Sequence, residues 1–93
     1  MTEAIMTMSA LAQPTRLRVT MTLASEFPKG LPVGELAARV DTPQNTMSGH
    51  LAILSRAGLV ATRRIGRIVE YRAEPGSLRS LAEFLLANAP EES

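Results

Sequence analysis

Apolar residues recur every three or four positions in the first quarter of the chain, and this period predicts two amphipathic helices. The first is expected over residues 2–12. The second is expected from Pro14 to about Ser25, because proline suits the first position of a helix. Their apolar stripes, the faces expected to pack, are Ile5, Met8 and Leu11 in the first and Leu17, Met21 and Ala24 in the second. The segment FPKGLP, with two prolines and a glycine, predicts a loop.

Two short helices separated by a tight turn are predicted next. The first covers residues 33–40, and the second has Thr42 as its N-cap, begins at Pro43 and runs to about Arg56. Gly58 suits the end of the second helix. The inner positions expected are Leu36, Ala37 and Val40 on the first helix and Met47, Leu51 and Leu54 on the second, with Ile53 touching the core.

A β-hairpin is predicted for the stretch LVATRRIGRIVEYRA, which is rich in valine, isoleucine, threonine and tyrosine. Its strands should cover about Leu59–Arg64 and Arg67–Ala73, with Gly66 at the tip. Alternation along the second strand places Val69, Tyr71 and Ala73 on one face and Ile68, Glu70 and Arg72 on the other.

A last helix is expected after Pro75 and Gly76, which close the hairpin. Ser77 is its predicted cap, and the helix runs through about Asn88. The apolar stripe of this helix consists of Leu78, Leu81 and Leu85, with Phe84 beside it.

The 93 residues are enough for one small domain with a single core. Two phenylalanines and one tyrosine are the only aromatic residues, so the core must be aliphatic. Such a small core is marginal alone, and a second copy of the chain would support it. No apolar run approaches the roughly 20 residues needed to span a bilayer. The N-terminal segment carries Glu3 and lacks a basic region, so we expect a cytoplasmic protein.

The absence of cysteine excludes disulfides, thiolate metal sites and thiol redox switching. His50 is the only histidine, so one chain cannot build a site from several histidines. We therefore expect neither a metal ion nor another cofactor.

The net charge of +1 does not by itself predict a nucleic-acid partner, but its distribution is informative. One short stretch contains five arginines and a single acid, Glu70. These arginines are Arg56, Arg63, Arg64, Arg67 and Arg72. A basic stretch in a nearly neutral chain indicates one positively charged edge.

The helix over residues 43–56 is apolar on one side and polar on the other, as a helix that enters the DNA major groove must be. Gln44, Asn45, Ser48 and Gly49 fall on the polar side near its start. Glutamine and asparagine can bond adenine edges, and serine can bond several base edges or phosphates. A helix N-terminus also attracts phosphate.

Three segments resemble the ArsR family of winged helix-turn-helix repressors. ELAARVDTPQNTMSGHLAILSRAGLV aligns without gaps with the family's helix-turn-helix, including the His-Leu pair and the AGLV exit. ALAQPTRLRVTMTLA resembles the second-helix signature, and RRIGRIVEYR resembles the wing. The resemblance covers about residues 8–88, and the three motifs occur in the family's order.

The resemblance implies a mainly α fold with five helices and a two-stranded β-hairpin wing, all in one domain over residues 1–93. The helix-turn-helix would cover about 33–57 and the wing about 59–73. It further implies a homodimer formed by the first and last helices. The residues expected at the DNA are Gln44, Asn45, Thr46, Ser48, Gly49, His50, Arg56, Arg63, Arg64, Arg67 and Arg72. Those expected at the dimer interface are Ile5, Met8, Leu78, Leu81, Phe84 and Leu85.

The chain also departs from the family pattern. Asp41 and Thr42 replace the usual glycine and apolar residue of the turn, and Met47 replaces a smaller residue. Gly49 stands where a longer polar side chain commonly helps to read DNA, so the operator of a relative does not carry over. The family's cysteine and histidine metal ligands are absent from GELAARVD and SLRSLAEFLLANA, so metal sensing does not carry over either.

Several residues admit two interpretations. His50 is either a DNA contact or a partly buried histidine bonded within the fold. Gly49 either permits close approach to DNA or is neutral. The arginines either contact DNA or lie on a solvated strand pair, and their place around a hairpin tip favours DNA.

These patterns favour a homodimeric, sequence-specific DNA-binding repressor that recognises an imperfect palindrome. The alternative is a winged-helix module that docks a protein partner and binds DNA weakly or not at all. An enzyme is not expected, since the chain offers no paired acid and base, activated nucleophile or phosphate-cradling loop. Whether a small molecule or a protein acts as effector is left open by the sequence.

Overall fold

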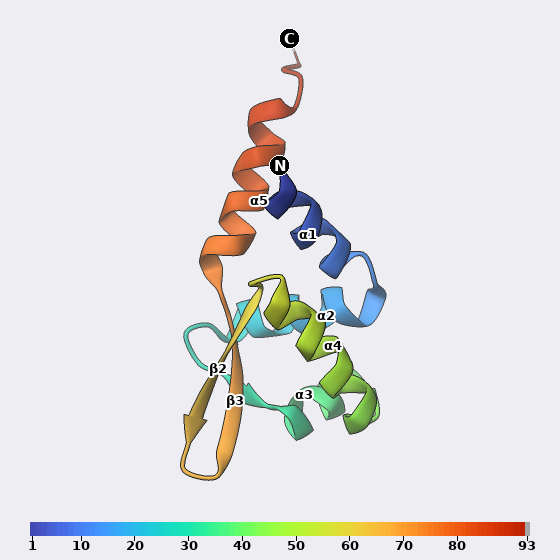
Figure 1. The fold of residues 1–93 in the computed structure, drawn as a ribbon, viewed down its shortest axis with the longest axis vertical. Coiled ribbons are helices and arrows are strands. Elements are labelled where there is room, and N and C mark those ends of the chain that lie inside the picture. Colours follow the sequence, from blue (N-terminus) through green and yellow to red (C-terminus); the bar gives the residue numbers. More distant parts are fainter. Residues whose placement is uncertain (93) are drawn as a thin grey trace.

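The computed structural model describes residues 1–92 and contains five helices and a three-stranded antiparallel sheet. The elements in chain order are α1 (Thr2–Leu11), α2 (Pro14–Glu26), β1 (Leu31–Pro32), α3 (Val33–Arg39), α4 (Gln44–Arg56), β2 (Val60–Ile65), β3 (Ile68–Ala73) and α5 (Pro75–Asn88). The molecule is elongated, 52 × 24 × 22 Å. The wing formed by β2 and β3 extends to one end of the long axis, and α5 extends to the other (Figure 1). The five predicted helices and the hairpin are confirmed.

Strand β1 is the element that the sequence did not predict. Leu31 pairs with Tyr71 and Pro32 with Glu70, which makes the strand order β1-β3-β2. The chain approaches β3 so closely at Gly30, just before β1, that a Cβ there would lie 2.8 Å from the carbonyl oxygen of Tyr71. The loop predicted for FPKGLP is therefore wrong at Leu31 and Pro32, and the predicted two-stranded hairpin has a third strand beside it. A strand of two residues, one of them a proline, is too short to show the alternation by which strands are predicted.

The hydrophobic core lies between the helices α2, α3 and α4 and the inner side of the sheet, and it is aliphatic as expected. It consists of Ala10, Val19, Leu23, Leu31, Leu36, Ala37, Val40, Met47, Leu51, Leu54, Leu59, Val60 and Ala73. The inner positions predicted for α3 and α4 are confirmed. Ile53 is not in the core, because 38% of its surface is exposed.

Helix α2 buries a different face from the one predicted. Leu17 and Met21 are 45% and 46% exposed, whereas Val19, Thr20 and Leu23 are buried. The hydroxyl of Thr20 donates a hydrogen bond of 2.9 Å to the carbonyl of Arg16. Burial of a polar side chain is tolerated when its hydrogen bond is made within the helix. The apolar stripe failed as a guide because the inner face includes this threonine.

The two helices of the helix-turn-helix end in the same hydrogen-bonding pattern, a Schellman motif. At the end of α3, the Thr42 N–H bonds the Ala37 carbonyl at 2.9 Å and the Asp41 N–H bonds the Ala38 carbonyl at 3.3 Å. Asp41 has a positive φ of 51° there. The family's usual glycine is thus replaced by an aspartate in the left-handed region, which aspartate tolerates better than most residues.

At the end of α4, the Leu59 N–H bonds the Leu54 carbonyl and the Gly58 N–H bonds the Ser55 carbonyl, both at 3.0 Å. Gly58 has a φ of 75°, so its predicted role at this helix end is confirmed.

Two predicted N-caps are wrong. The hydroxyl of Thr42 donates to the carbonyl of Val40 at 3.1 Å instead of capping α4, whose N-cap position is Pro43. Helix α5 begins at Pro75, so Ser77 lies within its first turn. Ser77 donates its hydrogen bond to the carbonyl of Gly58, which ties the start of α5 to the end of α4. In α5 the favourable position of proline at the start of a helix accounts for the beginning at Pro75.

Candidate nucleic-acid interface

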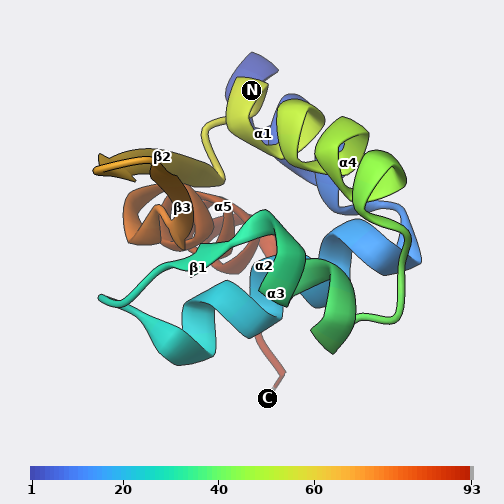
Figure 2. The ribbon, with the colours of Figure 1, turned by 90° about the horizontal axis from the view of Figure 1, so that it is seen from below.

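Helix α4 has one fully buried face and one exposed face. Met47, Leu51 and Leu54 have no exposed surface, and they hold the helix against the core. The opposite side carries the predicted polar residues, and Figure 2 shows α4 at the edge of the molecule. Gln44, Asn45, Thr46, Ser48 and Gly49 are exposed, and His50 is half-buried. The helix therefore presents a polar surface on a rigidly packed support.

Local hydrogen bonds orient two of these polar side chains. The side-chain oxygen of Asn45 accepts from the Thr46 N–H at 3.0 Å, and the Ser48 hydroxyl donates to the Gln44 carbonyl at 3.2 Å. The Asn45 amide nitrogen and the acceptor lone pairs of Ser48 remain for other partners. The side chain of Gln44 lies beside α3, since a Cβ on Gly34 would be 3.9 Å from its amide nitrogen and oxygen.

No neighbouring group within the chain requires a glycine at residue 49, in the middle of α4. A Cβ on Gly49 would have no atom within 4 Å. Glycine costs about 1 kcal/mol relative to alanine inside a helix, so this position lowers the stability of α4 without a local gain. The two interpretations of Gly49, close approach to DNA or neutrality, both remain. The half-buried state of His50 fits both of its interpretations as well.

The arginines of the wing do not form a single stripe. Arg63 pairs with Glu70, Ala61 with Arg72, and Arg64 with Val69. Paired residues share a face of the sheet and neighbours alternate, so Arg63 and Arg72 flank Glu70 on one face while Arg64 lies on the other. Arg67 lies in the turn beside Gly66, whose φ is 62°. Arg63, Arg64 and Arg67 are exposed and Arg72 is half-buried.

Apolar residues flank the tip of the wing, a surface that the sequence patterns did not indicate. Ile65 and Ile68 are 48% and 55% exposed and pair directly across the hairpin. Period-two alternation could have placed Ile65 on the same face as Arg63, because the two residues are two positions apart along the strand. The tip is therefore a mixed surface of arginine and isoleucine.

The predicted DNA-contact residues are not all in one place. The start of α4 and the tip of the wing lie toward the same end of the long axis (Figure 1). Arg56 occupies the opposite end of α4, about 18 Å from Gln44 along the helix axis at 1.5 Å per residue. The structure thus separates Arg56 from the residues at the start of α4.

Two other arginines are engaged within the chain. Arg39 on α3 pairs with Glu26 at 3.2 Å and with Glu35 at 3.0 Å. Its hydrogen bond to the Glu26 carboxylate raises the pKa of the Arg39 guanidinium above its ordinary value. The Arg16 guanidinium donates to the carbonyls of Ala10 at 2.6 Å and Ser9 at 3.4 Å, at the end of α1. Both arginines therefore support the fold locally.

The six residues predicted at a dimer interface fall into two groups. Ile5, Met8 and Leu85 are 56%, 38% and 49% exposed, and α5 contains no buried residue. The half-buried residues face other helices of the same chain: Leu81 and Phe84 line a cavity shared with α1, and Leu78 lies near Ala24 at the end of α2.

Across residues 1–92, no three histidine, aspartate or glutamate side chains gather closely enough to hold a metal ion. None of the helices in this range is both long enough and apolar enough to cross a membrane.

Comparisons with known proteins agree with this geometry. The family model described as "Helix-turn-helix domain" matches residues 11–63. The chain is 41% identical over 95 residues to the biofilm growth-associated repressor of Agrobacterium fabrum, covering 99% of this chain and 78% of that protein. The structure of an ArsR-like transcriptional regulator from Rhodococcus sp. RHA1 superposes with a TM-score of 0.81 at 27% identity, covering 92% of this chain and 78% of that one. The chain belongs to the ArsR family of winged helix-turn-helix regulators.

This ArsR-family protein is thus a DNA-binding transcriptional regulator. It is also 36% identical over 83 residues to the transcriptional activator HlyU of Vibrio cholerae, covering 89% of this chain and 74% of that protein. A homodimeric winged helix-turn-helix domain from Mycobacterium bovis matches with a TM-score of 0.75 at 27% identity, covering 91% of this chain and 77% of that one.

Proposed function

We propose that this ArsR-family regulator is a homodimeric repressor that binds an imperfect palindromic operator in the cytoplasm. The observation that carries this proposal is the division of α4 into a fully buried apolar face and an exposed polar face. A helix packed in this way can enter the major groove without losing its support in the core. The repressor of Agrobacterium fabrum is the relative that supports repression as the outcome of binding.

The start of α4 would read bases in this proposal. Gln44 and Asn45 are exposed at the first turn and have the amide groups that bond adenine edges. Thr46, Ser48 and His50 would contact phosphates or base edges, and Gly49 would let the helix approach the DNA backbone closely.

The arginines would supply binding energy that does not depend on sequence. Arg63, Arg64 and Arg67 extend from the wing into solvent, where they can neutralise phosphates. Arg72 and Arg56 would contact phosphates farther from the wing tip. Because this attraction releases counterions, it should weaken steeply as salt concentration rises.

The second copy would attach through the end helices. Ile5 and Met8 on α1 and Leu85 on α5 expose apolar surface that water solvates poorly, and burying it against a second copy is favourable. The homodimeric domain from Mycobacterium bovis supports this arrangement. A two-fold dimer would present two α4 helices to half-sites about 34–36 Å apart, or a multiple of that distance. One domain over residues 1–93 would then contain both the DNA surface and the dimer surface.

Fluorescence anisotropy with labelled DNA tests the proposal. The fragment upstream of the protein's own gene is compared with a scrambled fragment of the same composition at 50 and 200 mM salt. We expect tight binding to the first alone, and weaker binding at the higher salt concentration. The double variant Gln44→Ala/Asn45→Ala should bind both fragments equally, whereas Arg79→Ala, which removes an exposed arginine of α5, should behave as the wild type. Equal binding of both fragments by the wild type would remove the claim of sequence recognition. No binding at all would favour a protein-docking module.

A further inference from the structure

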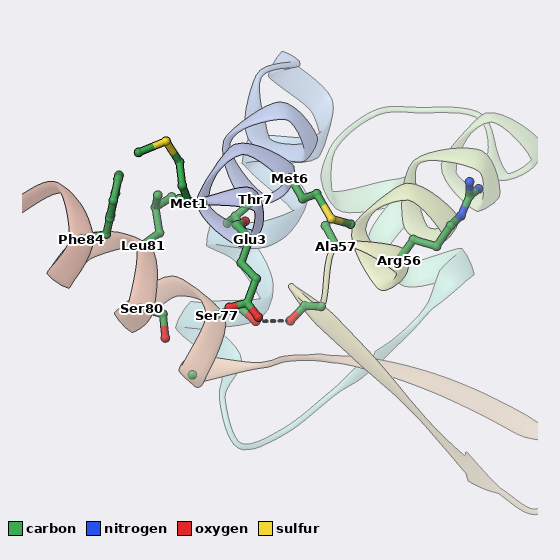
Figure 3. A pocket seen from close by; sticks show the side chains of 13 residues that line it. Met1, Glu3, Met6, Thr7, Arg56, Ala57, Ser77, Ser80, Leu81 and Phe84 are labelled. Carbon is green, nitrogen blue, oxygen red and sulfur yellow. Dashed lines mark hydrogen bonds between the residues drawn. The ribbon is translucent and has the colours of Figure 1, made fainter.

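A cavity of about 470 Å³ lies between α1, the end of α4 and the part of α5 up to Phe84. Figure 3 shows the side chains that line it, with Glu3 and Thr7 coming from α1 and Ser77, Leu81 and Phe84 from α5. The volume is within the range of about 300–1,000 Å³ typical of small-molecule sites. Its size therefore suits a small organic ligand.

The cavity and the exposed apolar surface of the end helices lie on opposite sides of α1 and adjoin each other on α5. Successive residues of an α-helix are rotated by about 100°, so Glu3 and Thr7 lie on nearly the opposite side of α1 from Ile5 and Met8. On α5, Leu81 and Leu85 are four residues apart and share a face, whereas Phe84 lies about 100° around the helix from Leu85. A second copy docked on Ile5, Met8 and Leu85 would leave the wall formed by Glu3 and Thr7 facing the same chain.

The polar groups in this cavity are mainly hydrogen-bond acceptors. The hydroxyl hydrogen of Thr7 is already donated to the Glu3 carbonyl at 2.9 Å, and that of Ser77 is donated to the Gly58 carbonyl. Each of these oxygens can therefore only accept a further bond. The Glu3 carboxylate also accepts, and it extends from α1 toward the start of α5 (Figure 3).

The arginine that lines the cavity directs its charge elsewhere. Arg56 borders the cavity with its stem, and its guanidinium is directed away from Glu3 and α5 (Figure 3). The ion pairs found in residues 1–92 are the two that Arg39 forms, so the Glu3 carboxylate has no cationic partner within that range. The cavity thus offers a negative charge and several acceptors to a ligand that donates.

The remaining lining is apolar. Met1, Met6, Leu81 and Phe84 border the same space as Glu3. Methionine adapts to irregular apolar ligands, and the face of a phenylalanine ring attracts cations. A ligand that matches both parts of the lining has an apolar body and an ammonium group.

We propose that this cavity binds a small arylalkyl amine in its protonated form. The ammonium would donate to the Glu3 carboxylate and to the hydroxyl oxygens of Thr7 and Ser77, and the aromatic body would lie among Met1, Leu81 and Phe84. Glu3 also lies in the first turn of α1, where a carboxylate interacts favourably with the helix dipole. The helix dipole would explain only why a carboxylate is favourable at residue 3. The proposed amine site rests on the cavity beside Glu3 as well.

Ligand binding in this cavity would affect α4, the helix proposed to contact DNA. Ala57 and Gly58 at the end of α4 are part of the cavity wall, and the hydrogen bond from Ser77 to Gly58 connects α4 to α5. A bound amine would therefore shift the end of α4 relative to the dimer helices and lower operator affinity. This second part rests on the proposed function, whereas ligand binding itself does not.

Isothermal titration calorimetry tests ligand binding in the absence of DNA. Tryptamine and phenethylamine are compared with tryptophol and 2-phenylethanol, which have a hydroxyl in place of the ammonium. We expect the amines to bind the wild type at least tenfold more tightly than the alcohols. Glu3→Gln should abolish this preference, and Glu83→Gln, which neutralises an exposed carboxylate elsewhere on α5, should keep it. Ser80→Phe, which fills the cavity, should abolish binding of amines and alcohols alike at an unchanged thermal midpoint.

The proposal is overturned if neither amine binds at millimolar concentration, or if Glu3→Gln keeps the preference for amines. A second titration measures operator affinity by anisotropy with and without tryptamine, and a fivefold or greater loss of affinity is expected. If the amine binds but operator affinity does not change, the coupling to α4 is wrong and the site stands. If the amine binds to a protein that ignores DNA, the proposed function fails and the site again stands.

Discussion

Helices α4 and α5 are similar in length, at 13 and 14 residues, but they use their apolar residues in opposite ways. Helix α4 buries Met47, Leu51 and Leu54 completely, and its free surface is mainly polar, with Ile53 as its one large apolar side chain. Helix α5 buries no residue, and its free surface includes Leu85 and Leu86, which are 49% and 78% exposed. A helix whose apolar side chains are buried within its own chain can present its polar side chains to another molecule. A helix whose apolar side chains remain exposed to solvent is stabilised when an apolar partner covers them.

The largest expected effect tests the support of α4. Leu51→Ala should lower the free energy of unfolding by about 2–5 kcal/mol, because it opens a cavity in a fully packed core. Ile53→Ala on the exposed side of the same helix is the matched control, and it should cost less than about 1.5 kcal/mol. Urea denaturation measures both. Equal losses would mean that the two faces of α4 do not differ in packing.

The next effect concerns α5. Leu85→Glu should raise the dissociation constant of the dimer at least about 100-fold, or 2.7 kcal/mol, since two-fold symmetry buries an uncompensated carboxylate from each copy. Sedimentation velocity would then find the 10.0 kDa monomer where the wild type sediments as a dimer. Ser25→Glu, an added carboxylate at the exposed end of α2, should leave the dimer intact. A Leu85→Glu variant that stays dimeric would move the interface away from this stripe.

The positions of the helices could be predicted from the sequence because their signals are local. Proline at residue 14 and glycine at residue 58 mark helix ends that the structure confirms, whereas the last helix begins at Pro75 and not after Ser77 as predicted. Strand β1 could not be predicted, because its two residues are held by pairing with Tyr71 and Glu70, which lie far along the chain. The buried face of α2 was assigned wrongly because Thr20 satisfies its hydroxyl within the helix.

The two candidate sites also differ in how local their sequence signals are. The exposed polar face of α4 follows from helical periodicity alone, so Gln44 and Asn45 could be selected from the sequence. The cavity that Glu3 and Ser77 share needs three elements from both ends of the chain, and no local pattern indicates it. The spacing of residues along the sequence predicts which side chains share a face of one helix or strand. A cavity between several elements can be located only when their three-dimensional arrangement is known.

A smaller effect is expected at single base pairs. Gln44→Ala or Asn45→Ala should reduce discrimination by about 1–3 kcal/mol at one operator position, because alanine cannot make the two hydrogen bonds of an amide to a base edge. Anisotropy titrations against a set of single-base operator variants measure this. A uniform loss over all variants would instead assign these side chains to the phosphates.

The wing should give the complementary result. Arg64→Ala or Arg67→Ala should weaken binding to operator and scrambled DNA alike. Removing one arginine–phosphate interaction should also reduce the slope of log affinity against log salt by about 1. Titrations at several salt concentrations measure the slope. A change in sequence preference would show that the wing reads bases.

The smallest effect compares the left-handed residues that follow α3 and α4, Asp41 and Gly58. Asp41→Gly should stabilise the protein by about 0.5 kcal/mol, since glycine adopts a positive φ without the steric cost that a Cβ brings. Gly58→Asp should lower the stability by at least as much. Thermal unfolding monitored by circular dichroism measures both, and a destabilised Asp41→Gly variant would indicate that the aspartate side chain supports the turn.

A hydroxyl-radical footprint of the wild-type protein on the fragment upstream of its own gene tests most directly whether α4 reads DNA while α5 joins two copies. We predict two protected segments on one face of the duplex, separated by about one helical turn or a multiple of it. A single protected segment would contradict the paired arrangement, and uniform protection along the fragment would contradict recognition of bases by α4.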